Sequence, residues 1–218
     1  LERMGVEAAG LYLDLSKQAW SAEGFEAAID LARACDVEGR RAALFAGEAV
    51  NNTEGRAVLH PALRAADDAD FRALGEAVSE EVAETRRAMA RFATDIGSGA
   101  ETGGTKQPFQ AIVHIGIGGS DLGPRLLWDA LRPLEPTIDL RFVANIDPRD
   151  MAEALAGLDP ETTLVVVVSK TFTTQETLAN AELAKAWLAA SLSPRRMARH
   201  LVGVTAAPEK AEAFGGGR

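Results

Sequence analysis

The second half of the sequence alternates short apolar runs with stretches of helical spacing, and this alternation restricts the possible folds most. The apolar runs, each of strand length, are residues 111–117, 140–144, 164–168 and 201–205. The stretches with helical spacing between them are residues 125–131, 148–158 and 177–192. Strands that are apolar throughout and alternate with helices form a parallel sheet covered on both faces. We therefore expect an α/β domain with a βαβαβαβ core.

The first half of the sequence predicts mainly helices. Two short helices fit residues 21–49, although residues 11–15 before them alternate like a strand. A long helix is predicted over residues 71–92, because apolar side chains recur there at steps of three and four while charged ones fill the opposite face. Residues 97–104 are rich in glycine and are the best candidate for a linker. We therefore expect a mainly helical N-terminal segment and a separate sheet domain, residues 1–97 and 105–218.

Charge and composition exclude several classes of function. The 218 residues contain 23 Lys and Arg against 32 Asp and Glu, a formal net charge of -9, which opposes binding to nucleic acid or to an anionic membrane. The longest purely apolar run, residues 164–168, is far shorter than the ~20 residues of a membrane span. Cys35 is the single cysteine and the three histidines stand far apart, so neither a disulfide nor a zinc site is expected. We expect a cytoplasmic protein without metal, whose anion site, if it has one, is local.

A glycine-rich segment, residues 115–124, follows the first strand of the predicted sheet and leads into a helix. Glycines at such a turn let main-chain N–H groups approach an anion at the helix N-terminus. A dinucleotide fingerprint starting at Gly116 would need glycine where Asp121 stands, and a Walker-type loop starting at Gly118 would need lysine where Pro124 stands. Both nucleotide motifs therefore fail. A tight strand-to-helix turn without a ligand is the alternative interpretation.

The third strand ends in a cluster of hydroxyls with one ammonium, residues 169–176. Thr173 and Glu176 fit a capping box, which accounts for one or two of the hydroxyls. The others, with the N–H donors of the following helix, suit a phosphate monoester. In the flavodoxin-like strand order 2-1-3-4-5, the first and third strands are neighbours, and ligands bind between their C-terminal ends. The two loops are thus predicted to face each other across a site for a small phosphorylated metabolite.

Three other groups carry weaker functional signals. His114 lies within an apolar strand, which favours a buried, hydrogen-bonded histidine over a catalytic one. Residues 147–150, Asp-Pro-Arg-Asp, follow the second strand and fit a ligand loop and a helix start equally well. A solvated face is the better interpretation of the basic cluster before the fourth strand, Arg195, Arg196, Arg199 and His200.

Three stretches of the sequence resemble the glucose-6-phosphate isomerase family: residues 51–64, NNTEGRAVLHPALR, residues 114–124, HIGIGGSDLGP, and residues 168–177, VSKTFTTQET. The resemblance is collinear from about Ala8 to Phe214, and the last two stretches are highly specific to the family. It implies the sugar-isomerase (SIS, flavodoxin-like) fold. It also implies reversible conversion of glucose 6-phosphate to fructose 6-phosphate in glycolysis and gluconeogenesis, without a cofactor and by a homodimer in the full-length enzyme.

The resemblance also implies which residues bind the sugar phosphate, and these coincide with the predicted crevice: Gly119, Ser120, Ser169, Lys170, Thr171 and Thr174. The family's glutamate base, ring-opening histidine and C-terminal lysine lie in later motifs, and none of these motifs is present. We therefore expect no catalytic residue in this chain. Asp121 and Glu176 are not taken as the base, because a carboxylate beside the phosphate would be repelled.

The sequence thus reads as the N-terminal part of a glucose-6-phosphate isomerase, less than half of the enzyme, with little activity when assayed alone. Residues 216–218 resemble a Gly-Gly-Arg of the family that leads to an active-site arginine, but the strand expected before it is missing, and Arg218 is not assigned. The alternative is a non-catalytic sugar-phosphate sensor on the same SIS fold. A natural start and stop and an attached DNA-binding segment would distinguish the sensor, and the sequence shows neither.

Overall fold

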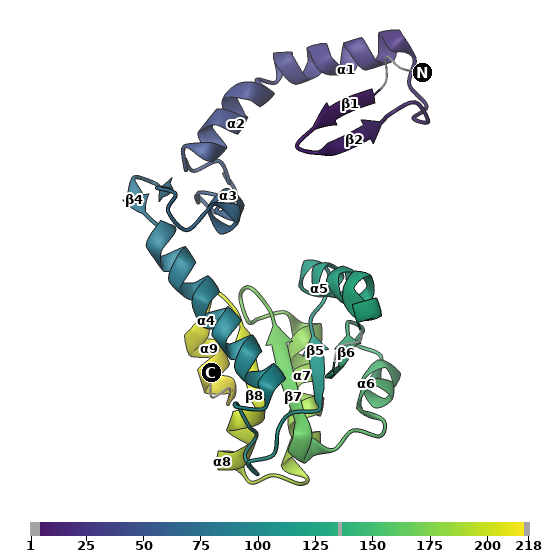
Figure 1. Ribbon diagram of the computed structural model, residues 1–218, viewed down its shortest axis with the longest axis vertical. Helices are drawn as coiled ribbons and strands as arrows, with labels where there is room; N and C mark the ends of the chain where they lie inside the picture. The colour runs from purple at the N-terminus through teal and green to yellow at the C-terminus, as the bar shows by residue number, and fades with distance from the viewer. Residues whose placement is uncertain (1–4, 135–136, 216–218) are drawn as a thin grey trace. The chain divides into compact units, whose positions relative to one another are not determined.

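The computed structural model describes residues 5–134 and 137–215, and the notable C-terminal Gly-Gly-Arg lies outside them. The chain divides into two compact units, of which the first ends at Arg87 and the second begins at Ala88 (Figure 1). This boundary falls inside one continuous helix, α4 (Ser79–Ser98). The assignment of residues 1–97 and 105–218 to different domains stays a prediction.

The first unit is built from short elements. Its helices are α1 (Ala22–Ala34), α2 (Val37–Phe45), α3 (His60–Arg64) and the first half of α4. Its strands form two antiparallel pairs, β1 (Gly5–Ala8) with β2 (Leu11–Asp14) and β3 (Arg72–Ala73) with β4 (Glu76–Ala77). The two predicted short helices and the strand at 11–15 are confirmed. Among the described residues of this unit, the buried apolar side chains are only Ala62 and Ala83, so it has little core of its own.

The predicted start of the long helix was wrong. The helix begins at Ser79 rather than at residue 71, because the intervening residues form the β3–β4 hairpin. Its two-residue turn, Leu74 and Gly75, has positive φ at both positions, 53° and 87°, as a type I′ hairpin turn requires. The Ser79 hydroxyl also accepts a hydrogen bond from the Phe71 amide at 2.6 Å. Apolar residues 71 and 74 matched the helical period without belonging to the helix.

The second unit is the predicted α/β domain. Within the described residues, a four-stranded parallel sheet is formed by β5 (Ala111–Ile115), β6 (Asp139–Val143), β7 (Thr163–Val168) and β8 (Leu201–Val204). The strands are arranged in the order β6-β5-β7-β8. This is the flavodoxin-like order 2-1-3-4, so the predicted fold class is confirmed. The accompanying helices are α5 (Gly119–Leu131), α6 (Pro148–Leu155), α7 (Gln175–Ala189), α8 (Pro194–Met197) and α9 (Pro208–Phe214).

The sheet has a core on both faces, as its uniformly apolar strands predicted. On one face, side chains of β5 and β7 pack with those of α6, α7 and α9, in a cluster that includes Val113, Val165 and Leu188. On the other face, Leu164 packs with Phe109 and with Ile96 of α4. The central strands β5 and β7 are thus covered by apolar side chains on both faces.

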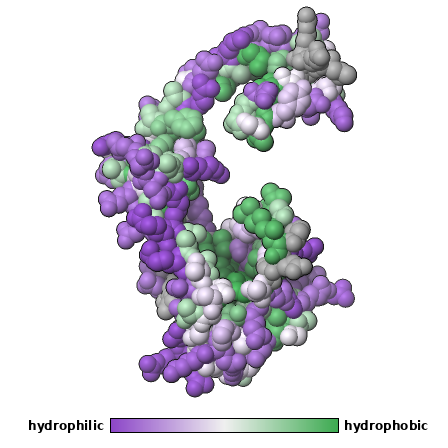
Figure 2. Space-filling view, viewed as in Figure 1, coloured by the Kyte–Doolittle hydropathy of each residue, from purple (hydrophilic) through white to green (hydrophobic). Residues whose placement is uncertain are grey.

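Helix α5 contributes little to this core. Asp121 is its buried residue among those described, while its leucines are exposed, from 55% at Leu131 to 69% at Leu126, and form an apolar patch over α5 (Figure 2). The contact of α5 with the rest of the unit is therefore made by its first turn, which follows the glycine-rich segment, rather than by its apolar face. In the described part of the chain, no helix is both long and apolar enough to cross a membrane.

The prediction of a solvated face was wrong for His200, although Arg195, Arg196 and Arg199 are exposed as expected. The His200 ring is fully buried. Its Nδ1–H donates to the Thr163 carbonyl and its Nε2 accepts from the Gly104 amide, both at 2.8 Å. Burial lowers the pKa of His200 from its usual 6.5. The ring is therefore a neutral link between the 97–104 segment and β7.

This arrangement predicts a pH-dependent stability. The folded pKa of His200 lies below the unfolded value, so the unfolded chain takes up a proton first as the pH falls through 6.5. The free energy of unfolding should be largest above this pH and decrease below it. Urea unfolding at about pH 7.5 and about pH 5.5 measures this decrease, which should be smaller in His200→Gln and unchanged in the exposed control His60→Gln. An equal decrease in all three proteins would contradict the role of His200.

Candidate functional site

The two loops of the predicted site leave the sheet side by side. β5 and β7 are hydrogen-bonded neighbours, with Ile115 opposite Val167 at the end of the ladder. A small cavity lies where the loops start, lined by Gly116 and Ile117 after β5 and by Glu176 and Thr177 of α7. The first and third strands therefore end side by side, as predicted. None of the six predicted phosphate-binding residues lines this small cavity, and a crevice for the phosphate stays a prediction.

The first loop turns sharply into α5. The Ser120 amide donates to the Ile117 carbonyl at 3.2 Å, and Gly118 has φ 59° and ψ -123°. These are the dihedral angles of the first central residue of a type II′ turn, which favours glycine. A Cβ on Gly119, the next residue, would meet no atom within 4 Å. The space beside this residue at the helix N-terminus is therefore open to a ligand. Gly119 thus begins α5 beside open space, while the Ser120 amide is used within the turn.

His114 holds this turn by a hydrogen bond to its main chain. The ring is 9% exposed, and its Nε2–H donates to the Ser120 carbonyl at 2.7 Å. The ring also packs against Phe142, with centroids 5.2 Å apart. The predicted buried, hydrogen-bonded histidine is therefore confirmed.

Asp121, which the sequence analysis rejected as a catalytic base, is already paired. The carboxylate is 4% exposed and accepts three hydrogen bonds from the Arg125 guanidinium, at 2.8 to 3.2 Å. The hydrogen bond with Asp121 raises the pKa of Arg125, whose guanidinium also lies 4.7 Å from the centre of the Phe142 ring. This ion pair neutralises the carboxylate in the first turn of α5. An anion approaching the turn therefore meets little repulsion from it.

The second loop presents its hydroxyls in two pairs. Ser169 is buried, and its Oγ lies 3.2 Å from Oγ1 of Thr174. The exposed Thr171 has its Oγ1 at 2.7 Å from Oγ1 of Thr173. Between Thr171 and Thr173, Phe172 has a positive φ of 50° and buries its ring in the core. Burial of this ring fixes the turn and leaves the neighbouring threonines outside the core.

The predicted capping box of Thr173 and Glu176 was wrong. The N-cap residue of α7 is Thr174, whose side chain makes no capping hydrogen bond, and the Thr173 hydroxyl pairs with Thr171 instead. The box failed because the helix begins one residue later than that motif requires. The hydroxyls beside the N-terminus of α7 are therefore not used for capping.

The main chain of Lys170 is held by the loop that follows β8, and that of Thr171 is held by α9. The Lys170 carbonyl accepts from the Ala206 amide at 2.9 Å and from the Thr205 hydroxyl at 3.1 Å. Lys210 of α9 donates from Nζ to the Thr171 carbonyl at 3.2 Å. This second ammonium was missed from the sequence. Its only signal was its place just after the fourth strand, whose C-terminal end lies at the same sheet edge.

The acidic segment after β6 caps a helix. Asp147 is the N-cap residue of α6 and accepts from the Arg149 amide at 2.9 Å. Asp150 Oδ2 accepts from the amides of Ala144 and Asn145, at 2.9 and 3.0 Å. Of the two interpretations left open, the helix start is confirmed. In residues 5–134 and 137–215, no cluster of three or more His, Cys, Asp or Glu side chains could hold a metal ion.

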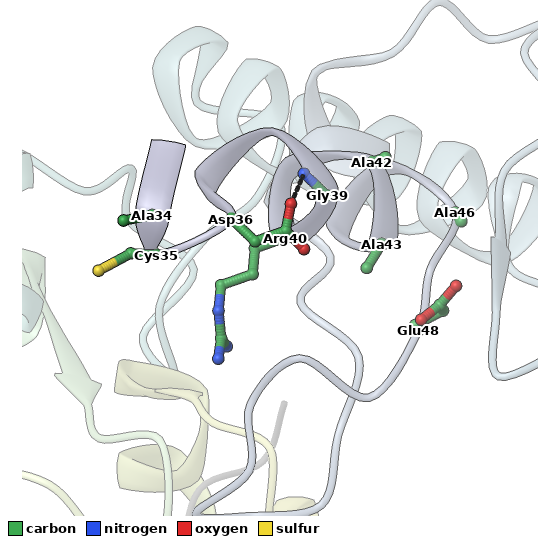
Figure 3. A pocket seen from close by; sticks show the side chains of 9 residues that line it. All are labelled: Ala34, Cys35, Asp36, Gly39, Arg40, Ala42, Ala43, Ala46 and Glu48. Atoms are coloured by element: carbon green, nitrogen blue, oxygen red, sulfur yellow. Dashed lines mark hydrogen bonds between the residues drawn. The ribbon is translucent and has the colours of Figure 1, made fainter. Parts of the chain in front are cut away.

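A further cavity lies in the first unit, and none of the predicted site residues lines it. It has a volume of about 750 Å³ and is formed by the end of α1 and by α2 (Figure 3). Alanines make up much of its wall, and the Asp36 carboxylate that lines it accepts from the Gly39 amide at 3.1 Å as a helix cap. Without converging polar side chains, this cavity is a weaker candidate than the two loops.

Comparison with known proteins agrees with the fold. A sequence model of the family described as phosphoglucose isomerase matches residues 14–217. The chain belongs to this family. It is 60% identical over 215 residues to a glucose-6-phosphate isomerase of Caulobacter vibrioides and 48% identical over 216 residues to one of Deinococcus radiodurans. These alignments cover 99% and 98% of the chain but only 40% of each relative.

A solved structure shows the same fold. The crystal structure of a glucose-6-phosphate isomerase from Chlamydia trachomatis superposes with a TM-score of 0.75 at 31% identity. The superposition covers 94% of this chain and 39% of that one. The chain therefore spans about 40% of the length of the phosphoglucose isomerase relatives that it matches.

Proposed function

We propose that this chain binds the phosphate of glucose 6-phosphate and fructose 6-phosphate in the crevice between the first turns of α5 and α7. The residues proposed to bind it are the six predicted from the sequence: Gly119, Ser120, Ser169, Lys170, Thr171 and Thr174. Membership of the phosphoglucose isomerase family supports this assignment. One observation carries the proposal. The N-termini of α5 and α7 follow neighbouring strands, and two pairs of hydroxyls that do not cap a helix, Ser169 with Thr174 and Thr171 with Thr173, lie beside the N-terminus of α7.

The net charge of -9 does not prevent such binding. At ~0.15 M salt, acidic side chains more than about 8 Å from the phosphate are screened. The nearest carboxylate of α5, Asp121, is paired with Arg125, while Lys170 and Lys210 belong to or contact the second loop. Local donors therefore outweigh the distant acidic charge.

We propose that phosphate binding by this chain serves the reversible aldose–ketose isomerisation of glycolysis and gluconeogenesis. The full-length enzyme would carry out this reaction in the cytoplasm as a homodimer. The reaction needs a carboxylate base to move a proton between C1 and C2, and groups that open the sugar ring. Asp121 is buried and ion-paired and does not suit the role of base. The chain thus supplies substrate binding, and the proton-transfer groups are assigned to the later motifs of the family.

Replacing a loop hydroxyl should weaken binding of a sugar phosphate. In titration calorimetry with 6-phosphogluconate, Thr171→Ala and Ser169→Ala should each raise the Kd about tenfold, because each loses a hydrogen bond to a charged group. Thr94→Ala, which removes an exposed threonine hydroxyl from α4, is the matched control and should bind like the wild type. Unchanged affinity in both loop variants would count against the site.

The chain alone should show almost no isomerase activity. Loss of positioned acid and base groups costs about a hundredfold to ten-thousandfold each, so its turnover of fructose 6-phosphate should be at least about a thousandfold below that of the Caulobacter vibrioides relative. A coupled assay measures both proteins under the same conditions. Comparable turnover would show that the proton-transfer groups lie within these residues.

A further inference from the structure

Two buried oxygens beside the two loops of the proposed phosphate site have no hydrogen-bond partner among the described residues. They are Oγ1 of Thr177 and Oδ1 of Asn180, and both residues are 2% exposed. They stand three positions apart on α7 and therefore share one face of that helix. Buried polar groups without partners are rare in folded proteins, and each asks for an explanation.

The surroundings of these oxygens restrict the explanation. The Asn180 amide is held, because its Nδ2 donates to the Asn145 carbonyl at 2.8 Å. Both residues line the same small cavity as Gly116 and Ile117, and this cavity has no room for a water molecule. A bridging water therefore cannot satisfy the oxygens in this arrangement.

The main chain of the first loop is the remaining source of partners. On the cavity walls, the Gly116 amide already donates to the Val143 carbonyl and the Ala144 amide to Asp150. The next amide of the loop belongs to Ile117, which also lines the cavity. Residues 116, 118 and 119 are glycines, so other backbone conformations are open to this segment, while in the free chain it is held by the hydrogen bond from the Ser120 amide to the Ile117 carbonyl.

We propose that Thr177 and Asn180 are positioning residues for the phosphate site, an inference that rests on the proposed function. When a phosphate binds at the N-terminus of α5, residues 116–119 move against α7. The Ile117 amide then donates to Asn180 Oδ1, and the Thr177 hydroxyl donates to the Gly116 carbonyl. These hydrogen bonds exist only in the bound state and therefore add to affinity without adding to the stability of the free chain.

Thr177→Val tests this inference, because valine keeps the shape of threonine and removes the hydroxyl. The variant should unfold in urea at the same or a higher midpoint than the wild type, since it loses a buried group without a partner. Its Kd for 6-phosphogluconate should rise about fivefold to tenfold. Thr177→Ser, which keeps the hydroxyl, should retain an affinity close to that of the wild type.

Thr163→Val is the matched control. Thr163 is equally buried, but its hydroxyl donates to the Asp159 carbonyl at 2.7 Å. This variant should lose stability and keep its affinity, the opposite of Thr177→Val. A Thr177→Val variant that binds like the wild type, or that is destabilised as Thr163→Val is, would overturn the positioning role.

The failure of this inference can be distinguished from the failure of the proposed function. If Thr171→Ala weakens binding while Thr177→Val does not, only this inference fails. If the wild type does not bind 6-phosphogluconate, the proposed function fails and the inference with it.

Discussion

The parallel pairing of β5 with β7 is the constraint on which the candidate site depends. These strands are separated in the sequence by β6 and α6, yet their register is continuous from Ala111 opposite Thr163 to Ile115 opposite Val167. Parallel strands end at the same edge of a sheet, so the helices that follow them, α5 and α7, begin next to each other. The two helix N-termini and the hydroxyls of the second loop thus lie at the same edge of the sheet.

Pairing of three of the local carboxylates reduces the repulsion that an anion would meet at this place in an acidic chain. The Asp121 carboxylate, in the first turn of α5, is occupied by the Arg125 guanidinium. Asp147 and Asp150, after β6, are occupied by main-chain amides of α6 and of the preceding loop. Thr171 and Lys210 bring a hydroxyl and an ammonium to the other loop. The electrostatic character of the crevice is therefore set by hydrogen bonds of single residues rather than by the net charge.

The sequence predicted the features that depend on local period and on topology rules. The four strands and the buried state of His114 follow from the apolar runs, and the order of the sheet follows the flavodoxin-like arrangement. What it missed depends on contacts between distant residues. His200 looked solvated beside three arginines, but its partners, Gly104 and Thr163, come from other segments. The β3–β4 hairpin was missed because its turn places Leu74 at a positive φ, which its residue type does not favour.

The central claim is that one anion contacts both loops at once, and amide chemical shifts measure this most directly. During titration of the isotope-labelled chain with 6-phosphogluconate, the amides of Gly119, Ser120 and Thr171 should shift together and saturate with a single Kd. Amides at the cavity of α1 and α2, such as that of Ala43, should not shift. Shifts confined to one loop, or shifts at the α1–α2 cavity instead, would contradict a phosphate site shared by α5 and α7.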